Sequence, residues 1–260
     1  IGARDIGRRT ATPKRCGSTN MTNNGRIWGD ATVSVDCFLG GISYDAANGN
    51  GTVFKNCHNT GNIEVTKNSL VKGNAAIGGM IGKYPTANEL KIFDACSNSG
   101  NISYAGKSNG STNIGGLFGY LSYTTVDGVK TPAYLVVRNG FVNTGNITHT
   151  GTTDGADNIS IGGLLGYCSF GQFSKGEHVW TGDVVNRGKI TCAGKSIGGI
   201  YRTGGIIGYS NTSLPETARL VNLGEIEFTG TPGVKDGKPG TAYAGGILGH
   251  SENATVTNAE

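Results

Sequence analysis

The sequence predicts an all-β protein, a right-handed parallel β-helix (β-solenoid) of about six coils. Three observations predict it. Two short glycine-containing motifs alternate six times along the chain, 46 of the 260 residues are glycine, and only 15% are charged. High glycine and asparagine content with little charge is typical of short strands joined by tight turns. A repeat whose units contact only their neighbours can also exceed the size of a single globular core.

The first 22 residues differ in charge from the rest of the chain. Residues 1–26 hold six basic side chains and one acid, so most of the net charge of +4 lies there and the remainder is close to neutral. We expect residues 1–22 to be a basic leader or cap, with contact to an anionic partner as the alternative. A basic stripe along the whole chain, as nucleic acid binding would require, is missing from the sequence.

The first motif, here called the Asn box, has the pattern Asn-x-Gly-x-Ile. We expect its asparagine to turn a corner between strands and its isoleucine to point inward. Stacked asparagines in successive coils can hydrogen-bond along the axis, which predicts a structural ladder of Asn59, Asn98, Asn143, Asn186 and Asn222. The six copies span Asn23–Ile27, Asn59–Ile63, Asn98–Ile102, Asn143–Ile147, Asn186–Ile190 and Asn222–Ile226.

The second motif, the Gly box, contains a glycine pair and, in five copies, a third glycine three residues after the pair. The first glycine of each pair falls at 40, 78, 115, 162, 204 and 245, so the interval varies between 37 and 47 residues. Constant motifs with variable spacers indicate strands joined by surface loops. Equivalent strands should pair in parallel about 4.8 Å apart, and the glycines allow a tight bend and close approach of coils.

Two columns of side chains follow from this register. The residue two before each Asn box is apolar, which makes Cys57 and Cys96 neighbours in the core. They are either buried thiols or, if their geometry allows, a disulfide between coils. A tyrosine column after the Gly boxes, with His250 in the last coil, is expected to stack and close the coil, or to bind sugars by stacking. Its tyrosines are Tyr44, Tyr120, Tyr167 and Tyr209.

Residues 23–260 are therefore expected to be a single solenoid domain. Residues 256–260 begin a seventh Asn box and stop before its glycine. The array is expected to be truncated at this end, or to finish in a cap strand.

The two boxes resemble the GLUG-motif repeats of bacterial secreted and surface proteins, in which a Gly-Gly-Leu/Ile-x-Gly segment alternates with an Asn-x-x-x-x-Gly-x-Val/Ile segment. The matching residues include 114–120 and 95–102, and the resemblance covers residues 23–258. It implies an adhesin-like stalk or binding region at the cell surface or outside the cell. It implies no catalytic residues, because the shared motif residues look structural.

Catalytic and metal motifs are not evident in the sequence. The six cysteines lack zinc spacing, no Gly-x-Ser-x-Gly elbow occurs, and the glycines do not form a nucleotide-binding loop. No cofactor is expected, and no apolar stretch is long enough to span a membrane. Asp154 and Asp157 form a close acidic pair, expected to be solvated, with calcium as the alternative. A polysaccharide-active enzyme would instead need carboxylates converging on one face, from Asp127, Asp154, Asp157, Glu177 and Asp183.

The functional expectation is a non-catalytic, extracellular or surface-bound adhesin-like module that binds a host or matrix glycan or protein. The alternatives are the polysaccharide-active enzyme and a purely structural stalk or filament subunit. Specificity is expected in the loops 121–134 and 168–180, whose aromatic side chains either bind the ligand or anchor the loops. The candidate binding residues are Tyr123, Tyr134, Phe170, Phe173, Lys175 and Trp180.

Overall fold

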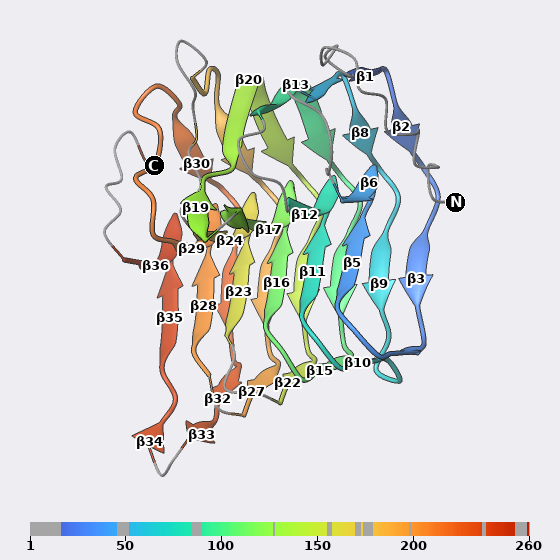
Figure 1. Cartoon of the computed structure of the whole chain (residues 1–260), viewed down its shortest axis with the longest axis vertical. Helices are drawn as coiled ribbons and strands as arrows, with labels where there is room; N and C mark the ends of the chain where they lie inside the picture. The colour runs from blue at the N-terminus through green and yellow to red at the C-terminus, as the bar shows by residue number, and fades with distance from the viewer. Residues whose placement is uncertain are drawn as a thin grey trace.

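The protein is a parallel β-helix of six coils, as predicted. A computed structural model describes residues 17–45, 52–84, 90–126, 128–154, 158–169, 173, 179–197, 199–235, 238–252 and 259. Within these ranges all regular structure is β. Each coil contributes to five parallel sheets, numbered I to V here in the order in which a coil visits them. The strands of sheet IV lie side by side in coil order in Figure 1.

The strands of each sheet are as follows. Sheet I contains β1 (Gly17–Thr19), β2 (Thr22–Asn23), β7 (Thr52–Lys55), β8 (His58–Asn59), β13 (Leu90–Asn98), β20 (Tyr134–Asn143), β25 (Val184–Asn186) and β30 (Leu220–Asn222). Sheet II contains β3 (Ile27–Gly29), β9 (Ile63–Val65), β14 (Ile102–Tyr104), β21 (Ile147–His149), β26 (Ile190–Cys192) and β31 (Ile226–Phe228). Sheet III contains β4 (Thr32–Val33), β10 (Leu70–Val71), β15 (Lys107–Ser108), β22 (Thr152–Thr153), β27 (Lys195–Ser196) and β32 (Thr231–Pro232).

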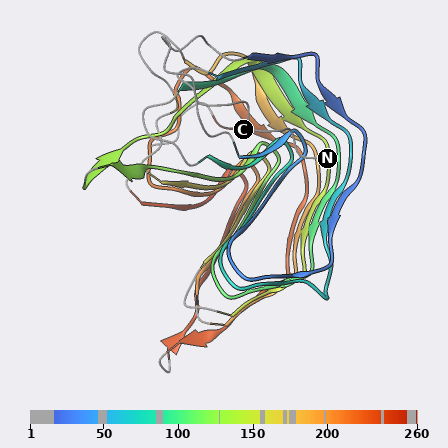
Figure 2. The ribbon, with the colours of Figure 1, turned by 45° about the vertical axis from the view of Figure 1, so that its right-hand side comes forward.

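The Gly box connects the last two sheets of every coil. Sheet IV contains β5 (Cys37–Gly40), β11 (Ala75–Gly78), β16 (Thr112–Gly115), β23 (Ile159–Gly162), β28 (Tyr201–Gly204) and β35 (Ala242–Gly245). Sheet V contains β6 (Ser43–Asp45), β12 (Ile81–Tyr84), β17 (Phe118–Ser122), β24 (Leu165–Ser169), β29 (Ile207–Ser210) and β36 (Leu248–Ser251). Two antiparallel hairpins, β18 (Thr124–Val126) with β19 (Val129–Thr131) and β33 (Val234–Lys235) with β34 (Lys238–Pro239), project from different corners of the coils (Figure 2).

The predicted asparagine ladder is present at the corner between sheets I and II. Each amide nitrogen donates to the amide oxygen of the next coil, for example from Asn98 Nδ2 to Asn143 Oδ1 at 2.7 Å. The same nitrogen donates to the carbonyl oxygen of the glycine two residues later in its own coil. Every member between Asn59 and Asn186 is buried, so these hydrogen bonds satisfy polar groups that would be costly to leave unpaired. The ladder comprises Asn23, Asn59, Asn98, Asn143, Asn186 and Asn222.

The ladder meets the Gly boxes inside the coil. A side chain at Gly79 would overlap the amide group of Asn98 and the backbone of Gly116. The same contact recurs in the neighbouring coils, where Gly116 faces Asn143 and Gly163 faces Asn186. The two motifs are therefore two halves of one contact between successive coils, which explains why they alternate without exception.

This contact lies between two hydrophobic clusters. One fills the space between sheets I and V, with Phe93, Phe118 and Leu165 among its fully buried members. The other fills the space between sheets II and IV, with Ile102, Ile114 and Ile161 among its members. The isoleucine of the Asn box belongs to the second cluster, as predicted. The coil is thus bent at the Gly box rather than round in section (Figure 2).

Sheet I carries a column of left-handed residues. Asn20, Asn56, Ala95 and Asn139 have φ between 51° and 57°. In the first two coils this conformation separates β1 from β2 and β7 from β8. Asparagine tolerates positive φ better than other side chains, and Asn56 Nδ2 donates to Asn20 Oδ1 at 2.8 Å. Ala95 occupies the same conformation without such a side chain.

Both ends of the array lie partly outside the described residues. Residues 17–22, predicted as part of a leader, belong to coil 1 because β1 pairs with β7; residues 1–16 lie outside the described residues. Of the expected seventh Asn box at residues 256–260, only Ala259 is among the described residues. Ala259 forms a bridge with Leu220, whereas stacking in box register would have placed Val256 there. No helix able to cross a membrane is found in the described part of the chain.

Candidate functional site in the groove between sheets IV and V

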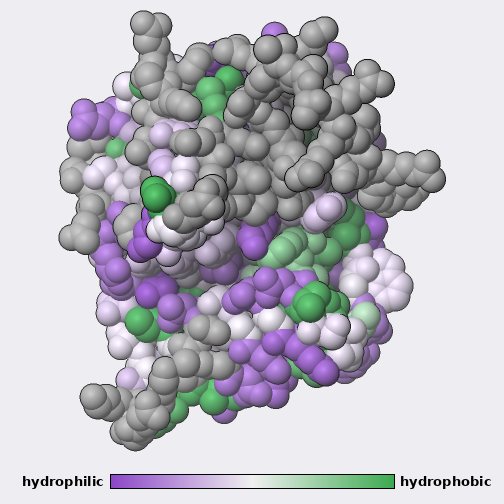
Figure 3. Space-filling view, in the orientation of Figure 1, coloured by the Kyte–Doolittle hydropathy of each residue, from purple (hydrophilic) through white to green (hydrophobic). Residues whose placement is uncertain are grey.

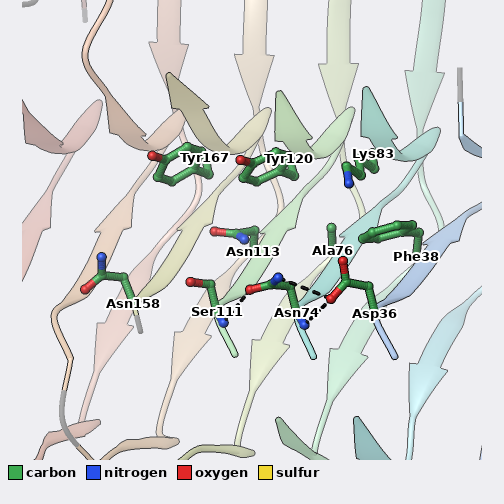
Figure 4. Close-up of a pocket in the computed structure, with 10 residues that line it drawn as sticks. All are labelled: Asp36, Phe38, Asn74, Ala76, Lys83, Ser111, Asn113, Tyr120, Asn158 and Tyr167. Atoms are coloured by element: carbon green, nitrogen blue, oxygen red, sulfur yellow. Dashed lines mark hydrogen bonds between the residues drawn. The ribbon is translucent and has the colours of Figure 1, made fainter. Parts of the chain in front are cut away.

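The outer faces of sheets IV and V face each other across a groove that follows the axis of the solenoid. A cavity of about 310 Å³ occupies its first four coils. Three rows of side chains line it, as Figure 4 shows, each row contributed by equivalent positions in successive coils. The lining comprises Asp36, Phe38, Asn74, Ala76, Lys83, Ser111, Asn113, Tyr120, Asn158 and Tyr167.

The sheet V side of the groove is a stack of tyrosines. The rings of Tyr120 and Tyr167 are 5.1 Å apart with an interplanar angle of 8°, and Tyr167 stacks on Tyr209 at 4.8 Å. The row continues to His250, which pairs in register with Tyr209. Because the rings cover one another's faces, sugar stacking on the faces of the inner rings is blocked. The stack therefore presents ring edges and hydroxyl groups.

Tyr44 does not belong to this stack, contrary to the prediction. Sheet pairing places Ser43 beside Ile81 and Asp45 beside Lys83, so Tyr44 stands opposite Gly82. Tyr44 takes the position of the third glycine of the Gly box, which the first coil lacks. Its side chain is 59% exposed.

The opposite edge of the groove is formed by residues just before the strands of sheet IV. Asp36 Oδ1 accepts hydrogen bonds from the backbone nitrogen of Asn74 at 2.7 Å and from its Nδ2 at 3.2 Å. Asn74 Oδ1 accepts from the backbone nitrogen of Ser111 at 2.9 Å. Asn158 Oδ1 accepts a hydrogen bond from the backbone nitrogen of Ile200 at 3.0 Å. These oxygens link successive coils, so this edge is primarily structural.

The floor of the groove is different. Asn113, Ser160 and Arg202 pair in register in three successive coils. Their neighbours Ile114, Ile161 and Tyr201 pack in the core, so strand alternation turns the three polar side chains to the outer face. Asn113 lines the cavity, and Ser160 and Arg202 continue the same row in coils 4 and 5, beyond the described lining residues.

The floor residues are almost completely buried, with exposures of 2%, 0% and 4%. Nevertheless Asn113 Oδ1, Ser160 Oγ and Arg202 Nη1 have no hydrogen-bond partner among the described residues. Buried polar atoms in native proteins are nearly always hydrogen-bonded. Two further exceptions in the described chain, Tyr104 Oη and His149 Nε2, lie in the interior. The three floor atoms differ because they form one row on the outer face beside the cavity, which makes this row the candidate for a ligand or water that completes the bonds.

Cations lie toward both ends of the groove. Lys83 Nζ is 4.4 Å from the centroid of the Phe38 ring. Arg202 Cζ is 4.4 Å from the centroid of the Tyr209 ring, and Arg202 Nε donates to His250 Nδ1 at 3.0 Å. Burial lowers the pKa of Arg202, and burial together with the nearby guanidinium lowers the pKa of His250. A neutral His250 can accept the hydrogen bond from Arg202.

None of the described loop residues predicted to bind a ligand is among the lining residues of this cavity. Trp180 is fully buried, donates from Nε1 to the carbonyl oxygen of Leu135 at 3.1 Å and packs edge-on against Phe173, which is 4% exposed. Both side chains are therefore buried rather than exposed as expected, and they anchor the loop. Their role in ligand binding stays a prediction. Tyr123 lies beside Lys130, whose Nζ is 4.9 Å from its ring centroid, and Tyr134 begins β20. Phe170 and Lys175 lie outside the described residues.

The other candidate residues are structural where they are described. Cys57 and Cys96 are buried free thiols, and burial raises the pKa of Cys96 to about 12. Asp154 forms an ion pair with Lys107, and Asp183 forms one with Arg219 at 2.8 Å. Asp127, Asp157 and Glu177 are not described. Across the described ranges no group of three or more His, Cys, Asp or Glu side chains could hold a metal.

The described surface on the face seen in Figure 3 shows no large apolar patch. In Figure 3 the apolar residues on the viewed face form small groups separated by hydrophilic ones. Among the exposed large apolar side chains, Trp28, Val35 and Tyr44 belong to coil 1, and Val129, Ile197, Leu223 and Val234 to later coils.

A sequence signal for the groove does exist. The residue two positions before the glycine pair differs in each coil, although the box around it is nearly constant, and in coils 3 to 5 it is polar. That this row faces a cavity could not be inferred without knowing that sheets IV and V face each other.

No protein-family model, no curated protein and no solved structure matches this chain. The resemblance to GLUG repeats therefore stays a prediction, and the assignment of the groove rests on its own residues.

Proposed function

We propose that this chain is a non-catalytic binding module of a secreted or cell-surface protein, and that it binds a short saccharide in the groove between sheets IV and V. The observation that carries the proposal is the row of buried, unpartnered polar atoms on the groove floor, at Asn113, Ser160 and Arg202. The GLUG resemblance supports an adhesin-like context for such a module.

The chemistry of the groove suits a saccharide. The floor offers an acceptor at Asn113 Oδ1, a group that both donates and accepts at Ser160 Oγ, and a donor at Arg202 Nη1. Sugar hydroxyls can donate to the first two and accept from the last two. The cavity of about 310 Å³ is at the lower end of small-ligand sites. Because the floor residues lie within paired strands, little ordering is needed on binding.

Catalysis is the less favoured alternative. Glycoside hydrolysis generally uses two carboxylates flanking the scissile bond. In the described lining of the cavity, Asp36 is the single carboxylate, and its Oδ1 is engaged by Asn74. A structural stalk or filament subunit is the other alternative; it gives no reason for buried polar atoms without partners.

A glycan array followed by saturation-transfer NMR on the positive saccharides tests the proposal. We expect Ser160→Ala and Asn113→Leu to weaken binding about tenfold each, as loss of one buried hydrogen bond predicts. Ser103→Ala is the matched control, because Ser103 lies between two buried residues of β14 and faces outward on sheet II. Binding unchanged by both groove variants, no saccharide bound at all, or cleavage of a bound saccharide would each overturn the proposal.

A further inference from the structure

The floor of the groove changes in chemical character along the axis. Parallel strands are about 4.8 Å apart, so the row from Asn113 through Ser160 to Arg202 spans two coil spacings. The row begins with a neutral amide oxygen, continues with a hydroxyl and ends with a cation. A ligand lying along it would meet a different polar group in each coil, which fixes its direction in the groove.

Arg202 is the member of the row that is hardest to explain by folding alone. A buried charge without a counter-ion costs several kcal/mol unless other groups compensate. The described partners of its guanidinium are the ring of Tyr209 and Nδ1 of His250, both uncharged. Tyr167, Tyr209, Tyr243 and Glu252 also act on it electrostatically.

Glu252 is the carboxylate in this set, and it is already engaged. Its Oε2 accepts a hydrogen bond from Tyr209 Oη at 3.0 Å. It forms no ion pair with Arg202 among those found in the described residues. The guanidinium is therefore held in place by Tyr209 and His250 while its Nη1 remains without an acceptor. A fixed, partly desolvated guanidinium is a strong partner for a carboxylate.

We propose that the groove selects acidic saccharides, with a hexuronate carboxylate bound by Arg202 and hydroxyl groups of the same ligand bound by Ser160 and Asn113. This inference rests on the proposed function, since it names the class of saccharide that the groove takes. Tyr167 lines the cavity and stacks on Tyr209, and Arg202 lies against the Tyr209 ring. The carboxylate end of the ligand would therefore lie at the coil 5 end of the cavity, next to Tyr167.

Lys83 supplies an internal comparison. It is the cation among the described lining residues of the cavity, whereas Arg202 lies on the same face of sheet IV one coil beyond the last of them. The Lys83 ammonium is 4.4 and 5.9 Å from the centroids of the Phe38 and Tyr120 rings. Its side chain is half-buried, whereas Arg202 is 4% exposed. The buried cation should discriminate more strongly between acidic and neutral ligands, because water screens it less.

Titration calorimetry with paired sugars tests the inference: glucuronate against glucose and galacturonate against galactose, at pH 7 and low salt. We expect at least one acid to bind ten or more times as tightly as its neutral partner. Arg202→Gln should remove this preference and leave the affinity for the neutral sugar within about twofold. Lys83→Gln removes the same charge at the other end and should preserve most of the preference.

The outcomes separate the two proposals. Equal affinity for acids and neutral sugars in the unmodified protein would overturn the acidic class and leave saccharide binding intact. A preference lost in Lys83→Gln but kept in Arg202→Gln would overturn the assignment to Arg202. No binding of any saccharide would overturn the proposed function itself. If Arg202→Gln fails to fold, the methyl esters of the two uronates decide with the unmodified protein: an ester that binds as tightly as its acid contradicts an ionic contact.

Discussion

The asparagine ladder and the groove floor are two columns of buried polar side chains in the same solenoid, and they differ in one respect. In the ladder, the amide of Asn143 bonds to Asn98, Gly145 and Asn186. On the floor, Asn113 Oδ1, Ser160 Oγ and Arg202 Nη1 have no partner in the described chain. The ladder repeats asparagine because each amide forms a hydrogen bond with the amide of the next coil. The floor residues form no such hydrogen bonds with one another, so their residue type can vary. Repetition marks the scaffold, and variation at a buried polar position marks the candidate site.

Breaking the ladder should have the largest effect on stability. Asn143→Ala removes an amide from the middle of the column, where it donates to two oxygens and accepts from Asn98 Nδ2. Several buried groups are then left unpaired, at about 1–3 kcal/mol each. We expect the free energy of unfolding to fall by about 3–5 kcal/mol in urea denaturation. A loss below about 1 kcal/mol would show that the ladder is not a principal source of stability.

The second largest expected effect is a loss of unfolding free energy at acid pH, caused by His149 in the core. Burial lowers the pKa of His149 to about 3, below its unfolded value near 6.5. Because the folded-state pKa is depressed, the neutral form contributes stability that is complete above pH 6.5 and is lost as the pH falls toward 3. Between pH 7 and pH 4 the loss should be about 3 kcal/mol.

The variant His149→Phe supplies the control for this pH dependence. It retains a ring where His149 stacks on Tyr104 but removes the titrating group. Its unfolding free energy should depend much less on pH over the same range, even though it loses the hydrogen bond to Tyr201. An equal acid loss in both proteins would assign the effect to other groups.

A matched pair of serines sharpens the comparison between scaffold and floor. Ser108 and Ser160 are both fully buried, but Ser108 Oγ contacts Gly110, Thr112 and Thr153 at 2.7–3.2 Å. Ser108→Ala should lower the unfolding free energy by about 2 kcal/mol. Ser160→Ala removes an unpartnered hydroxyl and should leave stability unchanged or raise it by up to about 1 kcal/mol. Equal losses for both would mean that Ser160 is satisfied within the fold.

The smallest expected effect concerns the left-handed column of sheet I. Ala95 has φ of 51°, a conformation that costs about 1 kcal/mol for a residue with a Cβ. Ala95→Gly should raise the thermal unfolding midpoint by a few degrees, corresponding to about 0.5–1 kcal/mol. Ala95→Asn should do the same. A lower thermal midpoint in both variants would contradict the conclusion that the positive φ of Ala95 strains the backbone.

The scaffold was largely predictable from the sequence, and the groove was not. The Asn and Gly boxes are local patterns, and their constant spacing to Ile102 or Leu117 is enough to set the register and the inward faces. The groove depends on the angle between sheets IV and V, and no short sequence pattern determines that angle. Trp180 and Phe173 looked like exposed loop aromatics because their neighbours are polar, yet burying two large rings anchors that loop. Tyr44 was misplaced by one residue because the first coil lacks the third glycine.

The contact between Gly79 and Asn98, repeated by Gly116 and Asn143, has a consequence for how such a chain can change. Each coil presents a glycine on one side and an asparagine on the other, so every joint between coils is chemically the same. Duplicating or deleting a whole coil recreates an existing joint and leaves both hydrophobic clusters continuous. Where the coil is one of coils 3 to 5, the floor row would gain or lose one polar position at the same time. The length and polarity pattern of the groove can thus be altered in whole-coil steps, independently of the framework that supports it.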